Sequence, residues 1–258
     1  MNRKTGKSLG GPLAGLIAIA CVVTGGIVYS PPARALAFTP SETEWATWPA
    51  YCRARYVVSA AGRESAFSLR VSTEEVEAYK SQYGGKVWHW LHHYCAGLAY
   101  ISRAKEANSE RQKERLLDEA IGQMRGQYRR VPRGDLFFSL AATSIARAYR
   151  EKGEPEEALA FIGESIDAHP DYSPAYSLAS LVYRDAGNLD KARQVLLEGN
   201  DACDGSSAEI HYFLGLIFLD LGDVDAAEVH AKLAYNLGYP LPGLMSRLNR
   251  LGRQVEQD

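Results

Sequence analysis

The chain has 258 residues, 46% of them hydrophobic, which is enough for one sizeable core or a solenoid. Its formal net charge is −2, but the first 37 residues hold four basic residues and no acidic one. The remainder therefore carries 25 basic against 31 acidic residues, a net charge of −6. A mildly acidic body argues against nucleic acid as the main partner.

The N-terminal segment, residues 1–37, has the pattern of an export signal: a basic start followed by an apolar run from Leu13 to Tyr29. The sequence ALA at residues 35–37 has the small side chains of a signal peptidase site and predicts cleavage before Phe38. The apolar run is long for a cleaved signal and short for a membrane helix. We therefore expect a periplasmic or secreted body, with an uncleaved single N-terminal span in the inner membrane as the alternative.

Residues 38–87 predict a helical N-terminal cap. Ser41 and Glu44 have the spacing of a capping box, which marks a helix start. Pro49 either kinks this helix or begins a second one, and the sequence leaves both options open. A further short helix is expected over residues 72–83, where two glycines end it.

Residues 88–132 predict a pair of helices. Gly97 and Tyr100 have the three-residue spacing of a small and an aromatic position on one helix, and Ala120 is a small residue on the next. Between them lies the hydrophilic run KEANSERQKER. We interpret this run as a solvated extension of the helices rather than as a binding arm.

A two-helix pattern recurs from Asp135 to Asn236. Its glycines are 34 and 35 residues apart, and each is followed five residues later by alanine and preceded four residues earlier by an aromatic residue. Each glycine is expected to end a first helix in the left-handed conformation, and Pro155 or an Asn or Asp residue then begins the second helix. The three sets are Tyr149, Gly153 and Ala158; Tyr183, Gly187 and Ala192; and Phe218, Gly222 and Ala227.

This pattern resembles the tetratricopeptide repeat (TPR) family, whose units recur at this period. The resemblance implies an all-α fold, an α-solenoid of antiparallel helix pairs with about four units over residues 88–239, the first divergent. Residues 240–258 place Leu244, Leu248 and Leu251 at helical spacing and predict a C-terminal capping helix. The chain is also similar to exported bacterial TPR proteins, which implies no particular activity.

The resemblance implies a partner-binding groove lined by the first helix of each unit. Aligned in this way, the groove mixes apolar and basic groups. Its arginines either receive an acidic segment, or they are only solvated or pair with Asp185 and Glu151. The candidate groove residues are Tyr94, Arg147, Arg150, Ser177, Arg184 and Tyr212.

Catalytic and metal sites are not indicated. The sequence has no Gly-x-Ser-x-Gly elbow, no glycine-rich phosphate loop and no isolated pair of carboxylates, so we expect no enzyme activity and no cofactor. His89 and His93 share a helix face, a spacing that can bind zinc. No carboxylate separates them as in the metalloprotease motif, so we interpret them as packed or hydrogen-bonded histidines.

The cysteines predict one disulfide. Export places the body where disulfides persist, and removal of Cys21 with the signal leaves three cysteines. Cys52 and Cys95 lie among aromatic residues where a cap must be fastened to the first unit, so they are the predicted pair. Cys203 lies in a polar turn, and three unpaired thiols are the alternative.

Two function classes follow from these expectations. The first is a non-catalytic adaptor of the bacterial cell envelope that binds a segment of a partner protein in its groove. The second is a structural subunit of an envelope complex that docks through the aromatic N-terminal cap or the C-terminal helix. Fold alone does not decide between them.

Overall fold

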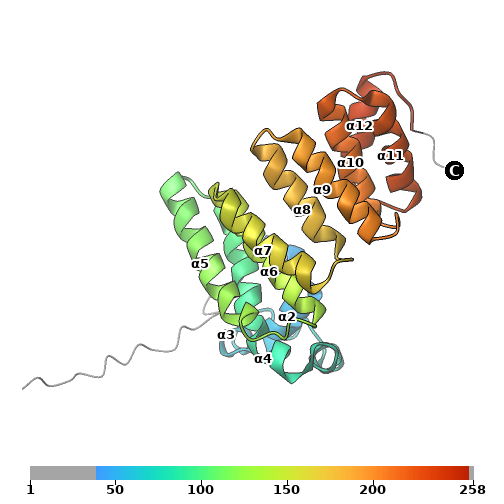
Figure 1. Cartoon of the computed structure of the whole chain (residues 1–258). Helices are drawn as coiled ribbons and strands as arrows, with labels where there is room; N and C mark the ends of the chain where they lie inside the picture. The colour runs from blue at the N-terminus through green and yellow to red at the C-terminus, as the bar shows by residue number, and fades with distance from the viewer. Residues whose placement is uncertain (1–38, 256–258) are drawn as a thin grey trace, which may run out of the picture. The chain divides into compact units, whose positions relative to one another are not determined.

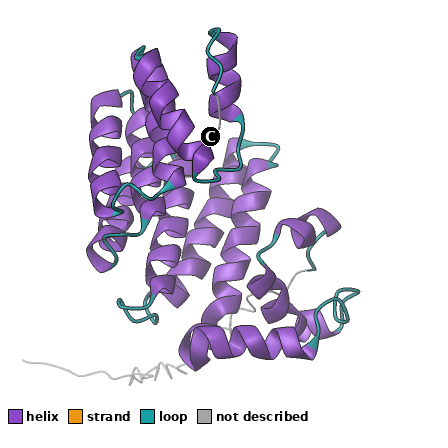
Figure 2. Cartoon of the chain, turned by 90° about the vertical axis from the view of Figure 1, so that its right-hand side faces the viewer, coloured by secondary structure: helices purple, strands orange, loops and turns teal. Residues whose placement is uncertain are grey.

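The computed structural model describes residues 39–255, and every regular element in this range is a helix (Figures 1 and 2). The prediction of an all-α solenoid of helix pairs is confirmed. The predicted signal peptide or anchor lies outside the described residues. Within residues 39–255, no helix combines the length and apolar character needed to cross a membrane.

The N-terminal cap consists of three short helices, α1 (Glu42–Thr47), α2 (Ala50–Val57) and α3 (Ala60–Arg63). The capping box at the start of α1 is present, since the Ser41 side chain accepts from the Glu44 amide and the Glu44 side chain accepts from the Ser41 amide. Pro49 stands at the N-cap of α2. It therefore begins a second helix rather than kinking the first.

The helix α4 (Thr73–Lys105) has Ser72 as its N-cap, and the Ser72 hydroxyl accepts a hydrogen bond from the Glu75 amide. Gly84 interrupts α4 with φ 67° and ψ 164°, a backbone conformation that favours glycine, so the predicted end of the short helix is a kink. The second part of α4 pairs with α5 (Glu110–Tyr128). Most of the hydrophilic insertion lengthens these two helices, and only residues 106–109 lie between them.

Three further helix pairs follow, and neighbouring pairs lie side by side in Figure 1. Gly153 and Gly222 end the first helix of their pairs with φ 75° and 84°, as the sequence predicts. The pairs are α6 (Leu136–Lys152) with α7 (Pro155–Ala168), α8 (Ser173–Asp185) with α9 (Leu189–Ala202), and α10 (Ala208–Leu221) with α11 (Val224–Asn236).

Small residues set the distance between paired helices. The alanines at the repeat positions, Ala158, Ala192 and Ala227, are completely buried. Gly97 of α4 lies so close to α5 that an added Cβ would stand 2.5 Å from Cγ of Met124. The small-residue pattern of the sequence is therefore a packing requirement.

The last helix, α12 (Gly243–Arg250), covers the end of the stack. Leu244 and Leu248 are fully buried against the apolar cluster that includes Tyr212 and Ala231. The helix ends one residue before Leu251, which is exposed. The predicted capping helix is therefore shorter than its apolar spacing suggested.

Candidate functional site

The N-terminal cap lies against α4 and forms one wall of the candidate site. Arg103 of α4 binds both carboxylate oxygens of Glu44, at 2.5 and 3.1 Å. Burial opposes ionisation of Glu44, but the hydrogen bonds from Arg103 and the Ser41 amide hold its pKa below the usual range. The ion pair thus fixes α1 on α4 at neutral pH.

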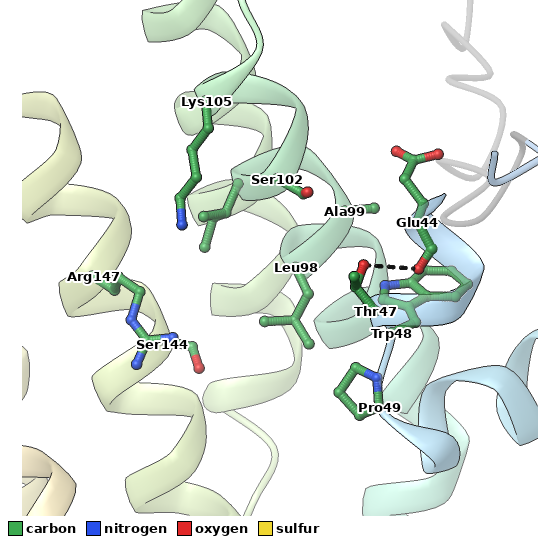
Figure 3. A pocket seen from close by; sticks show the side chains of 11 residues that line it. Glu44, Thr47, Trp48, Pro49, Leu98, Ala99, Ser102, Lys105, Ser144 and Arg147 are labelled. Atoms are coloured by element: carbon green, nitrogen blue, oxygen red, sulfur yellow. Dashed lines mark hydrogen bonds between the residues drawn. The ribbon is translucent and has the colours of Figure 1, made fainter. Parts of the chain in front are cut away.

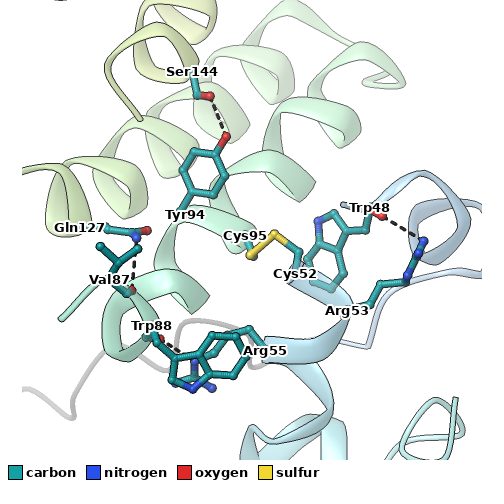
Figure 4. Close-up of a disulfide and its surroundings, with 10 residues drawn as sticks. All are labelled: Trp48, Cys52, Arg53, Arg55, Val87, Trp88, Tyr94, Cys95, Gln127 and Ser144. Carbon is teal, nitrogen blue, oxygen red and sulfur yellow. Dashed lines mark hydrogen bonds between the residues drawn. A yellow bond between two sulfur atoms is a disulfide. The ribbon is translucent and has the colours of Figure 1, made fainter. Parts of the chain in front are cut away.

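A disulfide provides a second attachment (Figure 4). Cys52 of α2 and Cys95 of α4 are bonded, and both residues are completely buried. The third described cysteine, Cys203, is a free thiol that donates to the backbone carbonyl of Asp171. Burial raises the pKa of the Cys203 thiol above its ordinary value, which lowers its thiolate fraction.

A pocket of about 280 Å³ opens where the α1–α2 turn, α4 and α6 meet (Figure 3). Trp48 and Pro49 line it from the cap, and Leu98 and Ile101 line it from α4. Its rim carries Lys105 of α4 and Arg147 of α6, both exposed. We call this site, with these six residues, the first-unit pocket.

The two cations at the rim have no ion-pair partner among residues 39–255, since no carboxylate oxygen lies within 4.0 Å of either. Lys105 extends from α4 toward the side of the pocket formed by α6 (Figure 3). Glu44 also lines the pocket, but its carboxylate is paired with Arg103. The apolar side chains beside two unpaired cations are therefore complementary to an apolar side chain next to a carboxylate.

The other two predicted groove arginines are engaged in ion pairs with the next unit. Arg150 of α6 binds Asp185 of α8 at 2.6 Å, and Arg184 of α8 binds Asp220 of α10 at 2.6 Å. Arg247 of α12 binds the same Asp220 at 2.7 Å. These pairs connect successive first helices, so Arg150 and Arg184 are less available to a ligand than Arg147.

Three predicted groove residues are buried instead of lining an open surface. Tyr94 and Ser177 are each 2% exposed and Tyr212 is 7% exposed. The Tyr94 hydroxyl shares a hydrogen bond of 2.9 Å with Ser144 Oγ, and Tyr212 stacks on Tyr239 with ring centroids 4.2 Å apart. The prediction that these side chains face a partner needs correction, because neighbouring elements cover this position of each first helix.

Two more groups, outside the pocket lining, interact electrostatically with Arg147. Tyr172, before α8, and Glu209, in the first turn of α10, are both half-buried. Burial raises the pKa of Glu209 above its usual range, while the positive charge of Arg147 acts against this rise. Burial likewise raises the pKa of Tyr172. Sequence reasoning missed both residues, which lie outside the middle of the first helices.

The histidine-rich middle of α4, after the interruption at Gly84, makes hydrogen bonds. His92 Nδ1 lies 3.2 Å from the guanidinium of Arg55, and His93 Nδ1 lies 2.7 Å from Gln123 Oε1. Burial, followed by the nearby charge of Arg55, lowers the pKa of His92 to about 4. Residues 39–255 contain no group of three or more His, Cys, Asp or Glu side chains that could hold a metal ion. His93 is therefore hydrogen-bonded, as the interpretation from the sequence expects, whereas His89 is exposed and its ring lies against Trp90.

Comparison with known proteins identifies the repeat. Residues 143–207, which extend from the middle of α6 to the end of the turn before α10, match the family model described as "Tetratricopeptide repeat". This chain contains tetratricopeptide repeats. No curated protein matches the chain significantly. TPR proteins generally serve as non-catalytic scaffolds for protein–protein interaction.

Solved structures of TPR proteins show similarity to the chain at low sequence identity. A crystal structure of MamA has 18% identity and a TM-score of 0.42, covering 65% of this chain and 82% of that one. The thermophilic TPR protein TTC0263 of Thermus thermophilus has 22% identity and a TM-score of 0.41, covering 64% of this chain and 92% of that one.

Proposed function

We propose that this TPR chain is a non-catalytic adaptor that binds a segment of a partner protein, with the first-unit pocket as its anchor. The observation that carries the proposal is the pair of unpaired cations, Lys105 and Arg147, beside an apolar pocket lined by Trp48 and Leu98. The segment that fits places an apolar side chain in the pocket and a carboxylate between the two cations.

The net charge of the body restricts how this ligand can be attracted. Apart from its N-terminal 37 residues the chain has a net charge of −6, so a free acidic segment is repelled by the body as a whole. The segment must therefore be held at the pocket by short-range attraction to Lys105 and Arg147. Binding should weaken with ionic strength, because exposed charges are screened.

Docking through the N-terminal aromatic cap or the C-terminal helix is the second candidate, and no specific observation favours it. Most of the large side chains that could supply either surface are buried within the chain, although Leu69 of the cap and Leu251 after α12 are exposed. Trp45 and Trp48 of the cap are buried, as are Leu244 and Leu248 of α12.

The location of this adaptor is a further part of the proposal. The basic and apolar N-terminal segment supports a place in the bacterial cell envelope, either as a released body that begins at Phe38 or as one attached by a single span. N-terminal sequencing of the protein recovered from its own cells distinguishes the two. Recovery of the uncleaved chain from the cytosol would contradict an envelope location.

Site-specific photocrosslinking tests the binding role. A photoreactive residue replaces Ser102, which lines the pocket, and in a parallel variant it replaces Gln194, which is exposed on α9. We expect an adduct with a defined protein from position 102 alone. The adduct should disappear with Arg147→Ala and persist with Arg115→Ala, a change at an exposed arginine of α5. Equal adducts from both positions, or an adduct insensitive to Arg147→Ala, would reject the pocket as the anchor.

A further inference from the structure

Positive charge is concentrated in one part of this acidic chain. No Asp or Glu occurs in residues 78–105 or in residues 120–134, and together these two stretches contain eight Lys or Arg residues. The first stretch forms most of α4, and the second contains the end of α5 and the turn that leads to α6. Since the body as a whole has a net charge of −6, this acid-free region is a local exception.

The two stretches meet at one end of the first helix pair. The helices α4 and α5 run antiparallel, so the end of α5 lies beside the part of α4 that follows Gly84 (Figure 1). His93 Nδ1 lies 2.7 Å from Gln123 Oε1. The guanidinium carbon of Arg130 lies 4.0 Å from the centre of the Trp90 ring, a cation–π contact. Basic residues of both helices therefore share one surface.

This surface carries four exposed cations, and three of them have no ion-pair partner. No carboxylate oxygen of residues 39–255 lies within 4.0 Å of Lys86, Arg129 or Arg130, whereas Arg133 lies 3.6 Å from Glu164. Unpaired positive charges gathered on an acidic body favour an anionic partner. We call Lys86, Trp90, Arg129, Arg130 and Arg133 the basic patch.

The basic patch also presents apolar side chains. Trp90 is only half-buried, and it lies four residues after Lys86, on the same face of α4. Leu136, three residues after Arg133, is 58% exposed. Cations beside an accessible indole ring and an exposed leucine match the boundary between water and lipid, where headgroups meet the charges and apolar groups approach the acyl chains.

An anionic phospholipid surface is the partner that these features fit best. Headgroup phosphates attract the cations and repel the acidic remainder of the body, so the basic patch sets the orientation of approach. The choice of lipid over nucleic acid rests on the envelope location proposed above, because an exported chain meets phospholipids there. In the anchored alternative, residues 30–38 reach at most about 30 Å from the apolar run, which keeps the body at the membrane.

We propose that the basic patch binds the anionic headgroups of a phospholipid membrane, with Trp90 at the level of the headgroups. Binding is peripheral and weakens as the ionic strength rises, since a few exposed charges carry it. Lys105 of the first-unit pocket lies fifteen residues beyond Trp90 on α4, which corresponds to about 22 Å along the helix. The pocket therefore stays accessible while the basic patch is on the membrane.

Vesicle sedimentation tests the proposal. The protein begins at Phe38, because the apolar run of the full chain would itself insert into vesicles, and residues 35–258 form a compact unit of their own. The vesicles contain phosphatidylglycerol with phosphatidylethanolamine, or phosphatidylcholine alone. We expect binding to the anionic vesicles only, and Arg129→Gln combined with Arg130→Gln should weaken it about tenfold. The matched control is Arg111→Gln with Arg115→Gln, which removes two exposed charges at the other end of α5 and should bind like the parent.

Several outcomes would overturn the proposal. The parent then fails to bind anionic vesicles, or it binds both kinds of vesicle equally. If the two double variants bind equally, whether like the parent or more weakly, the basic patch is not the binding surface. Binding of soluble polyglutamate in place of vesicles would identify an acidic protein segment as the ligand.

Two controls complete the experiment. Lys105→Ala with Arg147→Ala should leave sedimentation unchanged, so membrane binding is tested separately from the first-unit pocket. Circular dichroism spectra that match the parent show that the exposed substitutions leave the fold intact.

Discussion

Replacing Gly199 by alanine should separate α8 from α9. A Cβ added at Gly199 would stand 2.5 Å from Cγ and 2.7 Å from Cβ of Tyr176. These atoms lie next to the Tyr176 backbone, so a rotamer change does not remove the clash and the helix itself must move. Overpacking of this kind costs about 1–3 kcal/mol. Alanine in place of glycine inside a helix contributes about 1 kcal/mol in the opposite direction.

The matched control is Gly163→Ala in α7, where nothing lies within 4 Å of an added Cβ. This variant gains the helix propensity without the clash and should be more stable than the parent by up to about 1 kcal/mol. The difference between the two variants isolates the overpacking, about 1–3 kcal/mol. Urea unfolding followed by far-UV circular dichroism measures it. If Gly199→Ala is as stable as Gly163→Ala, the close approach of α8 and α9 is wrong.

Three further predictions concern the repeat core, the disulfide and acid stability. Ala192→Leu should cost about 1–3 kcal/mol in the same unfolding assay, because Ala192 is completely buried, and an unchanged midpoint would contradict the repeat register. Peptide mapping after thiol blocking should recover Cys52 linked to Cys95, and alkylation of both cysteines would disprove the pairing. Because the bridge spans a separation of 43 residues, it should contribute roughly 4 kcal/mol to the free energy of unfolding. Burial, then the charge of His211, lowers the pKa of His230 to about 4, so the unfolded chain binds a proton at this histidine at a higher pH than the folded chain does. The free energy of unfolding should therefore fall by less than about 3 kcal/mol as the pH drops from 6.5 toward 4. His230→Gln should flatten that part of the pH profile, and an unchanged profile would refute this assignment.

Local chemistry made much of the fold predictable from the sequence. The left-handed glycines, the capping box at Ser41 and the small residues between paired helices each follow from neighbours within a few positions or from the repeat period. The outcome at Pro49 was open, because a proline in this position can either kink a helix or begin the next one. The structure decides it through the packing of α2 on α4.

The candidate site was less predictable because its contacts join residues far apart in the chain. Nothing near Leu98 in sequence indicates that Trp48 and Pro49 share its pocket. The pairing of Arg150 with Asp185 was foreseen as one alternative, and the pairing of Arg184 with Asp220 was not. A usable signal was present, since each aspartate lies about one repeat after its arginine. The burial of Tyr94 and Ser177 depends on elements that cover them from outside their own helices.

The affinity of the captured segment for the chain tests the central claim most directly. A synthetic peptide of the segment crosslinked at position 102 is titrated with the parent chain, with Lys105→Ala combined with Arg147→Ala, and with Arg115→Ala, each at low and at high salt. We predict that the double variant binds at least tenfold more weakly at low salt and loses most of the salt dependence, while Arg115→Ala matches the parent. Equal affinity and equal salt dependence in all three proteins would contradict binding at the first-unit pocket.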